Sequence, residues 1–420
     1  MARPRIAVNL EPLRASRDLR LLVLGNFVSG LGTQAALVAL PYQLYIQTRS
    51  TLLTGLLGAF ELVPLVTMAL LGGALADRVD RRRLLLADQV ALVLLSGGLA
   101  AAVYAGHPPI LLLYVLGGLL AGAGAVQNVA RSSIVPNLVT PDHLRGALAL
   151  NFGLYQLTMV LGPSLGGLLI ATSSVATTFA VDAVSCLAMV VAAAAMAAQP
   201  PHRSEEATPG VRRSIVEGLR FVRGNRALLS SFAIDLSAMT FGMPRALFPA
   251  LSLTVFHAGA TGTGILLAAV SAGATVAALT TGWLERARRL GLIVIAAVAV
   301  WGAAIALAGA VTTLWAAAAL LAVAGAADSV SAVCRSVINQ TVTPDEMRGR
   351  MSAVYSLVVT SGPRFGDIES GFVAALRGVQ FSVISGGLVS LGAAALFLAA
   401  SPALAGYDVE TAVPVPAPAG

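Results

Sequence analysis

Residues 73–83 read G-A-L-A-D-R-V-D-R-R-R and form an arginine-dense turn between two long apolar runs. Such a turn is typical of a short loop that joins two membrane-spanning helices at the cytoplasmic face, because these loops carry an excess of basic residues. The composition points the same way, since the chain is 57% hydrophobic and 11% charged, whereas soluble domains are roughly 25% charged. A chain of 420 residues with so few polar groups cannot hide its apolar surface from water, so we predict an integral membrane protein.

Twelve apolar windows follow one another along the chain, each about 20 residues long and able to cross about 30 Å of hydrocarbon. Lipid-exposed strands with open edges would leave backbone groups unsatisfied, so we expect every window to be a helix. The expected limits are 20–42, 52–76, 84–105, 110–134, 147–171, 175–198, 227–251, 262–284, 290–310, 313–336, 352–376 and 380–400.

The arginines set the expected orientation. All 27 basic residues are arginine, and 21 of them fall on the side that holds the N-terminus, whereas the opposite loops hold only Arg49 and Arg377. The positive-inside rule then places both termini in the cytoplasm. Because the charges sit in short loops rather than along one exposed face, the net charge of +7 does not indicate a nucleic-acid partner.

The two halves of the chain repeat. G-P-S-L-G at 162–166 matches G-P-R-F-G at 362–366, and V-T-P-D-H-L-R-G at 139–146 matches V-T-P-D-E-M-R-G at 342–349. Six helices plus six in parallel repeat is the layout with which transporters form a central site between two rocking halves. We therefore expect an N-terminal six-helix bundle over 1–198, a cytoplasmic linker over 199–226, a C-terminal bundle over 227–400 and a disordered tail over 401–420.

These motifs resemble those of major facilitator superfamily transporters. G-A-L-A-D-R at 73–78 is similar to motif A, and G-P-S-L-G-G at 162–167 is similar to motif C, which marks drug:proton antiporters. T-P-D-E-M-R-G-R at 343–350 and R-A-L-F-P-A-L at 245–251 resemble the enterobactin-exporter branch. The resemblance implies an all-α membrane fold of two pseudo-symmetric bundles with twelve transmembrane helices.

The same resemblance implies roles for the motif residues. In motif A it implies a cytoplasmic latch, against the simpler alternative of positive-inside anchoring, and in motif C it implies close packing and bending of the fifth helix, since glycines thin a helix and proline removes one backbone bond. Two residues depart from the family pattern: Asp80 replaces a motif A glycine and Thr158 replaces a motif C glycine. The residues concerned are Gly73, Asp77, Arg78 and Arg82 for motif A, and Gly162, Pro163, Gly166 and Gly167 for motif C.

Ionisable residues inside spans are the sharper signal, because each costs about 2.5–3.5 kcal/mol at the centre of an inserted helix. Glu61 lies near the middle of the second expected helix with no basic residue within one turn of it. Asp367 replaces the glycine that the repeat would place there, and Arg364 lies one turn before it, so proton coupling and a structural ion pair both remain open. Asp235 and Arg245 share the seventh expected helix too far apart to bond, so each needs another partner.

Polar side chains inside the spans suggest the lining of a cavity, although they could equally be interhelical contacts. Arg245 could bind an anionic cargo, or it could pair with Glu61 or Asp367. We expect packing or helix-end roles for Asp88, Asp182 and Asp328, and structural roles for Arg131 and Arg335. The predicted cavity residues are Asn26, Thr33, Gln127, Asn151, Tyr155, Arg245 and Arg364.

Several classes of function are disfavoured. The absence of lysine removes the phosphate-binding residue of a Walker A loop, and the four histidines lack metal-ligand spacing. Cys186 and Cys334 fall inside apolar runs and are expected to be buried thiols. We therefore predict no enzyme, no cofactor and no metal site.

The predicted function is proton-coupled export of a small amphipathic molecule, with Glu61, Asp367 or Asp235 carrying the proton. A siderophore-like metabolite is the leading cargo, followed by a hydrophobic drug. The alternatives are an ion-coupled nutrient importer and a lysolipid flippase of the same fold. We expect a monomer in the bacterial cytoplasmic membrane whose partners are its cargo, protons and lipid.

Overall fold

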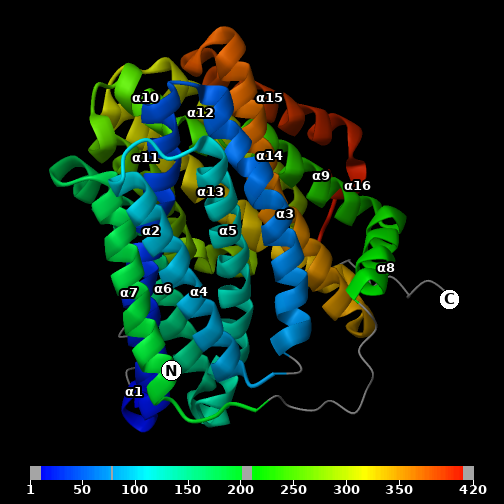
Figure 1. Cartoon of the computed structure of the whole chain (residues 1–420). Coiled ribbons are helices and arrows are strands. Elements are labelled where there is room, and N and C mark those ends of the chain that lie inside the picture. Colours follow the sequence, from blue (N-terminus) through cyan, green and yellow to red (C-terminus); the bar gives the residue numbers. More distant parts are fainter. Residues whose placement is uncertain (1–10, 77–78, 201–210, 410–420) are drawn as a thin grey trace. The chain divides into compact units, whose positions relative to one another are not determined.

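The computed structural model describes residues 11–76, 79–200 and 211–409 (Figure 1). Every regular element in these ranges is a helix, and none is a strand. Within them, eleven stretches are long and apolar enough to cross a membrane. The remaining expected window, 352–376, is also helical, but it lies in α14 (Arg348–Arg377), whose charged residues make it too polar to meet the same standard.

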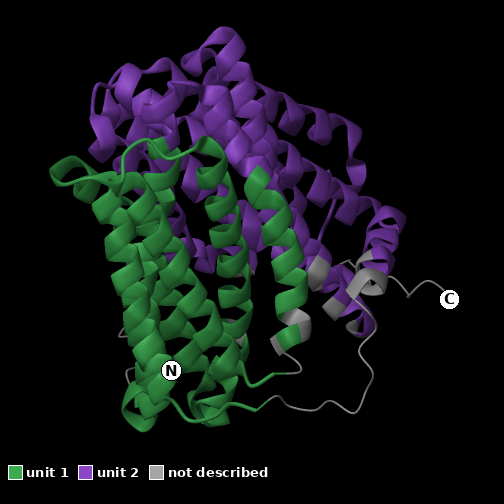
Figure 2. Cartoon of the chain, viewed as in Figure 1, with its two compact units in different colours: residues 1–43, 60–205 green, residues 44–59, 206–420 purple. Residues whose placement is uncertain are grey.

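The chain divides into two compact units, coloured separately in Figure 2. Unit 1 comprises residues 1–43 and 60–205, and unit 2 comprises residues 44–59 and 206–420. The helices of the N-terminal half, of which α2 and α3 contribute to both units, are α1 (Glu11–Ala15), α2 (Arg17–Thr48), α3 (Thr51–Ala76), α4 (Arg81–Tyr104), α5 (Ile110–Ile134), η1 (Val135–Asn137), α6 (Pro141–Thr172) and α7 (Val175–Ala195).

The second half contains more helical pieces, because its first and last spans are interrupted or extended by short helices. They are α8 (Val211–Gly224), α9 (Arg226–Phe241), η2 (Arg245–Leu247), α10 (Phe248–Thr254), α11 (Gly259–Thr280), η3 (Thr281–Arg286), α12 (Leu290–Ala310), α13 (Leu314–Val342), η4 (Asp345–Met347), α14, α15 (Val379–Ala400) and α16 (Pro402–Ala405).

Residues 44–59 belong to unit 2 because the start of α3 packs closely on α14. Thr51 Oγ1 donates a hydrogen bond of 3.2 Å to the carbonyl oxygen of Gly371. A Cβ atom on Gly55 would lie 2.9 Å from the Cα atom of Gly371, so both glycines are needed for this approach. The compact unit therefore includes a segment that chain order alone would assign to the first bundle.

Each unit has its own apolar core. In unit 1, Leu22, Leu85 and Met189 are fully buried and bring together α2, α4 and α7. In unit 2, Val294 and Ile338 are fully buried between α12 and α13.

The seventh expected helix, 227–251, is broken rather than continuous. α9 ends at Phe241, where the amide of Gly242 still donates to the carbonyl of Ala238 at 2.8 Å. Pro244 follows, and a proline disfavours helical backbone at the residue before it. Asp235 and Arg245 consequently lie on separate elements, α9 and η2, instead of one helix.

Both the linker and the tail contain helices where the structure describes them. The linker contains α8, and its Glu217 pairs with Arg350 at the start of α14 at 3.0 Å. The tail continues as α16, where Leu404 is fully buried and the amide of Val409 donates to the carbonyl of Arg288 at 3.1 Å. The disorder expected for 401–420 therefore does not hold for 401–409, and 410–420 lie outside the described residues.

Candidate functional site

The motif A turn is held together within unit 1. Asp80 caps α4 by accepting hydrogen bonds from the amides of Arg82 and Arg83 at 2.9 and 3.3 Å, and its other oxygen accepts from the amide of Gln199 at 3.1 Å. An aspartate at a helix N-cap satisfies amides that lack helical partners. The cap explains why this chain has Asp80 where the family pattern has glycine.

Arg82, one of the predicted gating residues, binds the C-terminal end of α7. Its Nε donates to the carbonyl of Ala193 at 2.7 Å, and its Nη2 donates to that of Ala194 at 2.5 Å. A guanidinium is well suited there, because the last carbonyls of a helix lack partners and carry partial negative charge. Gly73 lies in the last turn of α3, whereas Asp77 and Arg78 lie outside the described residues, so the gating role stays a prediction.

The motif C glycines bring α6 against α2. Gly162 and Gly166 are buried with Pro163 and Gly167. A Cβ atom on Gly166 would lie 2.7 Å from the carbonyl oxygen of Ala35, and one on Gly162 would meet Gln34. Backbones this close leave no room for a side chain, so these glycines have at least a packing function.

The repeat preserves this packing in unit 2. Gly366 of α14 faces the backbone of Met239 in α9, and a Cβ atom on Gly362 would lie 3.0 Å from Cβ of Met239. In unit 1, Gly30 of α2 lies opposite Thr158 of α6, whose Cγ2 would be 3.1 Å from an added Cβ atom. The small residue missing from motif C at Thr158 is thus supplied by the facing helix.

Three charged residues of unit 2, which we call the Asp367 group, join η2 to α14. Arg245 Nη2 donates to Asp367 Oδ2 at 3.0 Å, and Arg364 Nη1 lies 3.7 Å from the same oxygen. The amide of Ala246 donates to Asp367 Oδ1 at 3.1 Å. Of the alternatives that the sequence left open, the structure shows Arg245 paired with Asp367, and Arg364 close enough to form a second ion pair.

A second charged cluster of unit 2, which we call the Arg335 group, joins α9 to α13. Arg335 Nη1 forms an ion pair with Asp235 Oδ1, and its Nη2 lies 3.6 Å from Asp328 Oδ1. The side chains of Arg335 and Asp235 are almost completely buried. Sequence reasoning asked for a partner for Asp235 but did not find this group, although Asp328 and Arg335 are seven residues apart and therefore share one helix face.

The buried acid of unit 1, Asp182, has neutral partners instead. Ser96 Oγ and Thr33 Oγ1 donate to its two oxygens at 2.6 and 3.2 Å, and Cys186 Sγ lies 3.6 Å away. Ser29 continues these contacts from Cys186 to Gln89, whose amide donates to Asp88 at 3.4 Å. We call this the Asp182 network; it joins α2, α4 and α7, and Thr33 is the predicted cavity residue that it contains.

The other predicted cavity residues of unit 1 are spread over α2, α5 and α6. Asn26 is buried, and its amide has no hydrogen-bond partner among the described residues. Tyr155 lies under Arg131, with the guanidinium carbon 4.3 Å from the ring centroid, whereas Gln127 and Asn151 are only partly buried. Tyr155 therefore contacts Arg131, for which the sequence predicts a structural role.

Glu61 is buried within α3, ten residues from the start of that helix and three before Pro64. Its burial agrees with its expected position inside a span. Whether it carries a proton stays a prediction.

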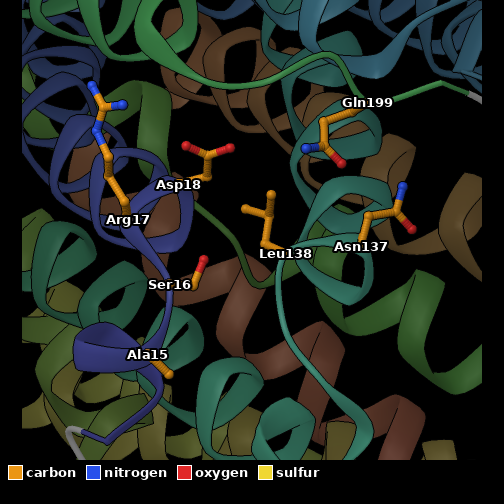
Figure 3. A pocket seen from close by; sticks show the side chains of 7 residues that line it. All are labelled: Ala15, Ser16, Arg17, Asp18, Asn137, Leu138 and Gln199. Atoms are coloured by element: carbon orange, nitrogen blue, oxygen red, sulfur yellow. The ribbon is translucent and has the colours of Figure 1, made fainter.

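A pocket of about 380 Å³ lies at the start of α2 (Figure 3). Asp18 and Arg17 line one side and Asn137 and Gln199 line the other. One oxygen of Asp18 accepts a hydrogen bond of 3.0 Å from the amide of Ala197, so this side chain holds the segment that follows α7. No residue predicted for cargo or proton binding lines this pocket.

Comparisons with solved structures agree on the fold. The chain superimposes on a crystal structure of the nucleoside transporter NupG with a TM-score of 0.69 at 14% identity, covering 94% of this chain and 100% of that one. It superimposes on an inward-facing bacterial homologue of the human lysosomal transporter Spinster with a TM-score of 0.70 at 14% identity, covering 92% and 97%. At such low identity, these likenesses speak for the fold alone.

Comparisons of sequence identify the family. The chain is 28% identical over 402 residues to the enterobactin exporter EntS of Citrobacter koseri, covering 93% of this chain and 94% of that protein. It is 29% identical over 395 residues to EntS of Shigella boydii, with 92% of each covered. The family model described as "Transmembrane secretion effector" matches residues 7–419. The chain therefore belongs to this transporter family of the major facilitator superfamily and is not an enzyme.

Proposed function

We propose that this protein is a proton-coupled exporter of a small amphipathic molecule, with a siderophore-like metabolite as its leading cargo. The observation that supports it most is the placement of buried carboxylates inside the helices of a chain that resembles enterobactin exporters over more than nine-tenths of its length. A carboxylate buried in a span costs free energy, so its presence there indicates a function or a paired charge.

In this proposal α14 is the eleventh of twelve transmembrane helices. It is 30 residues long, sufficient to cross the bilayer. Asp367 and Arg364, which make it polar, contact each other within unit 2 instead of standing alone in lipid. The excess of arginine on one side supports cytoplasmic termini and a bacterial inner-membrane location.

The chemistry of coupling follows from what an ionised carboxylate can bind. Ionised Glu61, Asp235 or Asp367 accepts hydrogen bonds from hydroxyl or amide groups of the cargo, and protonation removes an acceptor. Cargo and proton then compete for one site, and by linkage each lowers the affinity for the other. Such competition is the property that an antiporter requires.

Arg245 makes the sign of this linkage testable. When Asp367 is ionised, its Oδ2 forms an ion pair of 3.0 Å with Nη2 of Arg245. Protonation of Asp367 would release Arg245 for an anionic group of the cargo, so that proton and an anionic cargo would bind together. Antiport therefore predicts that acidification weakens cargo binding, whereas strengthened binding would indicate symport through Arg245.

The test is proton movement in proteoliposomes under an imposed pH gradient, with a panel of siderophores, cationic drugs and lysolipids. Export coupled to protons predicts a proton flux that depends on one cargo class, and loss of that flux in Glu61→Gln or Asp367→Asn. Full flux in both variants would overturn the coupling assignment. Accumulation rather than depletion of the labelled cargo in intact cells would favour an importer, and a response to lysolipids alone would favour a flippase.

A further inference from the structure

The Arg335 group contains two carboxylates but one guanidinium. Arg335 contacts Asp235 and Asp328 through different nitrogens. α11 and α12, which pack along α13, contain no ionisable residue. Among the described residues Arg335 also interacts with Tyr355 of α14 and with Cys334, and neither carries positive charge. With both acids ionised, the group would therefore carry a net negative charge in the protein interior.

An uncompensated charge in a protein interior is strongly unfavourable, and the usual remedy is protonation. One guanidinium balances one carboxylate, so the neutral form of the group holds one proton shared between two acids. Coupled acids of this kind titrate as a pair. The remaining question is which carboxylate exchanges the proton.

Geometry favours Asp328. Asp235 is in direct contact with Arg335, and 3% of its side chain is exposed. Asp328 is 3.6 Å from the guanidinium, and 36% of its side chain is exposed although it lies at the middle of α13. Of the two roles expected for Asp328, helix end or packing, its position at the middle of α13 excludes the helix end.

The exposed part of Asp328 does not face the apolar side of α13. The large apolar side chains that α13 exposes are Trp315, Val323 and Val337. At about 100° per residue, each lies at least about 140° around the axis from Asp328. The carboxylate is therefore directed away from the apolar surface of α13.

Ser331 supplies a second observation. It lies between Asp328 and Arg335 on α13, and residues three or four apart on a helix are neighbours. Ser331 is 1% exposed, and its hydroxyl has no hydrogen-bond partner among the described residues. A protonated Asp328 is a donor as well as an acceptor, so this hydroxyl can serve the carboxyl group in its neutral form.

We propose that Asp328, together with Asp235 and Arg335, forms a one-proton site in unit 2, with Asp328 as the carboxyl group that takes up and releases the proton. The site deepens the proposed function and rests on it for its role in transport. Asp328 is then an additional coupling residue. Arg335 is a positioning residue that pairs with whichever of the two carboxylates is ionised.

The proton itself can be detected without any cargo. Infrared difference spectra of the purified full-length protein on acidification should contain a band of a protonated carboxyl group. We expect Asp328→Asn to remove one component of that band and Asp328→Glu to restore it at a shifted frequency. An unchanged band in Asp328→Asn protein that elutes as a single species would overturn the proposal.

Charge balance supplies a second test that does not depend on one variant folding. In Asp235→Asn, Arg335 has only Asp328 to balance it, so Asp328 should stay ionised and the same component should disappear. The double variant should lose no further component, because both single variants already lack the shared proton. Loss of two separate components in the double variant would show two independent acids and would contradict a shared site.

Transport separates this inference from the proposed function. In proteoliposomes, wild-type protein should show cargo-dependent proton flux, and Asp328→Asn should reduce it to the protein-free background. Flux that persists in Asp328→Asn overturns the role of Asp328 in coupling and leaves the exporter proposal intact. Absence of flux in the wild type with every cargo of the panel overturns the proposed function, and the infrared result then still decides whether the site binds a proton.

Discussion

Asp182 of unit 1 and the buried acids Asp235 and Asp367 of unit 2 have different kinds of partners, although the two halves of the chain share repeated motifs. Asp182 of unit 1 accepts hydrogen bonds from neutral groups such as Ser96 and Thr33. Asp235 and Asp367 of unit 2 bind arginines. The difference shows that the repeat has kept its packing while its charges have diverged.

Two arginines in matching positions of the repeat make the comparison direct. Arg131 of α5 lies over the ring of Tyr155. Arg335 of α13 interacts with Tyr355, which occupies the same position of the repeat as Tyr155. Arg335 also binds Asp235 and Asp328. The arginine–tyrosine interaction is thus common to both units, and in unit 2 the arginine also belongs to an ionic cluster.

The largest effect is expected when this ionic cluster loses its cation. Arg335→Leu leaves the buried Asp235 and the partly exposed Asp328 without a counter-charge, and removal of one partner from a buried ion pair costs about 3–5 kcal/mol. The matched change in unit 1, Arg131→Leu, removes a cation–π contact, for which about 0.5–2 kcal/mol is typical. Thermal unfolding of both variants in detergent measures this difference. Equal losses of stability would show that the two arginines contribute equally and would contradict the comparison.

Neutralising an acid should also affect the units unequally. Asp367→Asn weakens bonds from Arg245 and the amide of Ala246, and hydrogen bonds to charged groups contribute about 1.5–3 kcal/mol. Asp182→Asn leaves a neutral side chain among neutral donors, where a typical bond contributes about 0.5–1.5 kcal/mol. A lower melting temperature for Asp182→Asn than for Asp367→Asn would refute this ordering.

The packing that both units share should respond to volume. Gly166→Ala places a methyl group against the backbone of Ala35, and overpacking of this kind costs about 1–3 kcal/mol. Gly362→Ala meets the side chain of Met239, which can shift, so we expect a smaller loss. Gly153→Ala is the control, because a Cβ atom there meets nothing within 4 Å; a melting temperature as low as that of Gly166→Ala would contradict the packing argument.

The smallest effect is expected at the motif A turn. Asp80→Ala removes the N-cap of α4 and should cost about 1 kcal/mol. Asp80→Asn keeps an acceptor for the amides of Arg82 and Arg83 and should recover most of the loss. Chemical denaturation compares the two variants, and an Asp80→Asn loss as large as that of Asp80→Ala would remove the capping explanation.

The helices and the family could be predicted from the sequence because apolar length and short motifs are local properties. The twelve expected windows all fall on helices, although the seventh is divided at Gly242 and Pro244 and the eleventh is more polar than a simple span. The assignment of residues 44–59 to unit 2 could not be predicted, since it depends on the close approach of Gly55 to Gly371.

The partners of the buried charges were harder to predict. Residue type and position indicated that Asp235, Asp367 and Arg245 needed partners, but the choice among them depends on how separate helices rotate against each other. Arg335 escaped notice because the repeat with Arg131 suggested a structural role for both. The Asp182 network could not be predicted, because serine, threonine and cysteine are common in buried helix contacts and give no distinct signal in the sequence.

The most direct test of the account is cargo-dependent proton flux in proteoliposomes that contain the wild type, Asp367→Asn or Asp182→Asn. We expect a cargo in the panel that drives proton flux through the wild type and through Asp182→Asn, because the Asp182 network is internally satisfied by neutral groups. We expect no such flux through Asp367→Asn. Flux that survives in Asp367→Asn and is lost in Asp182→Asn would place proton coupling in the Asp182 network of unit 1 and contradict the account.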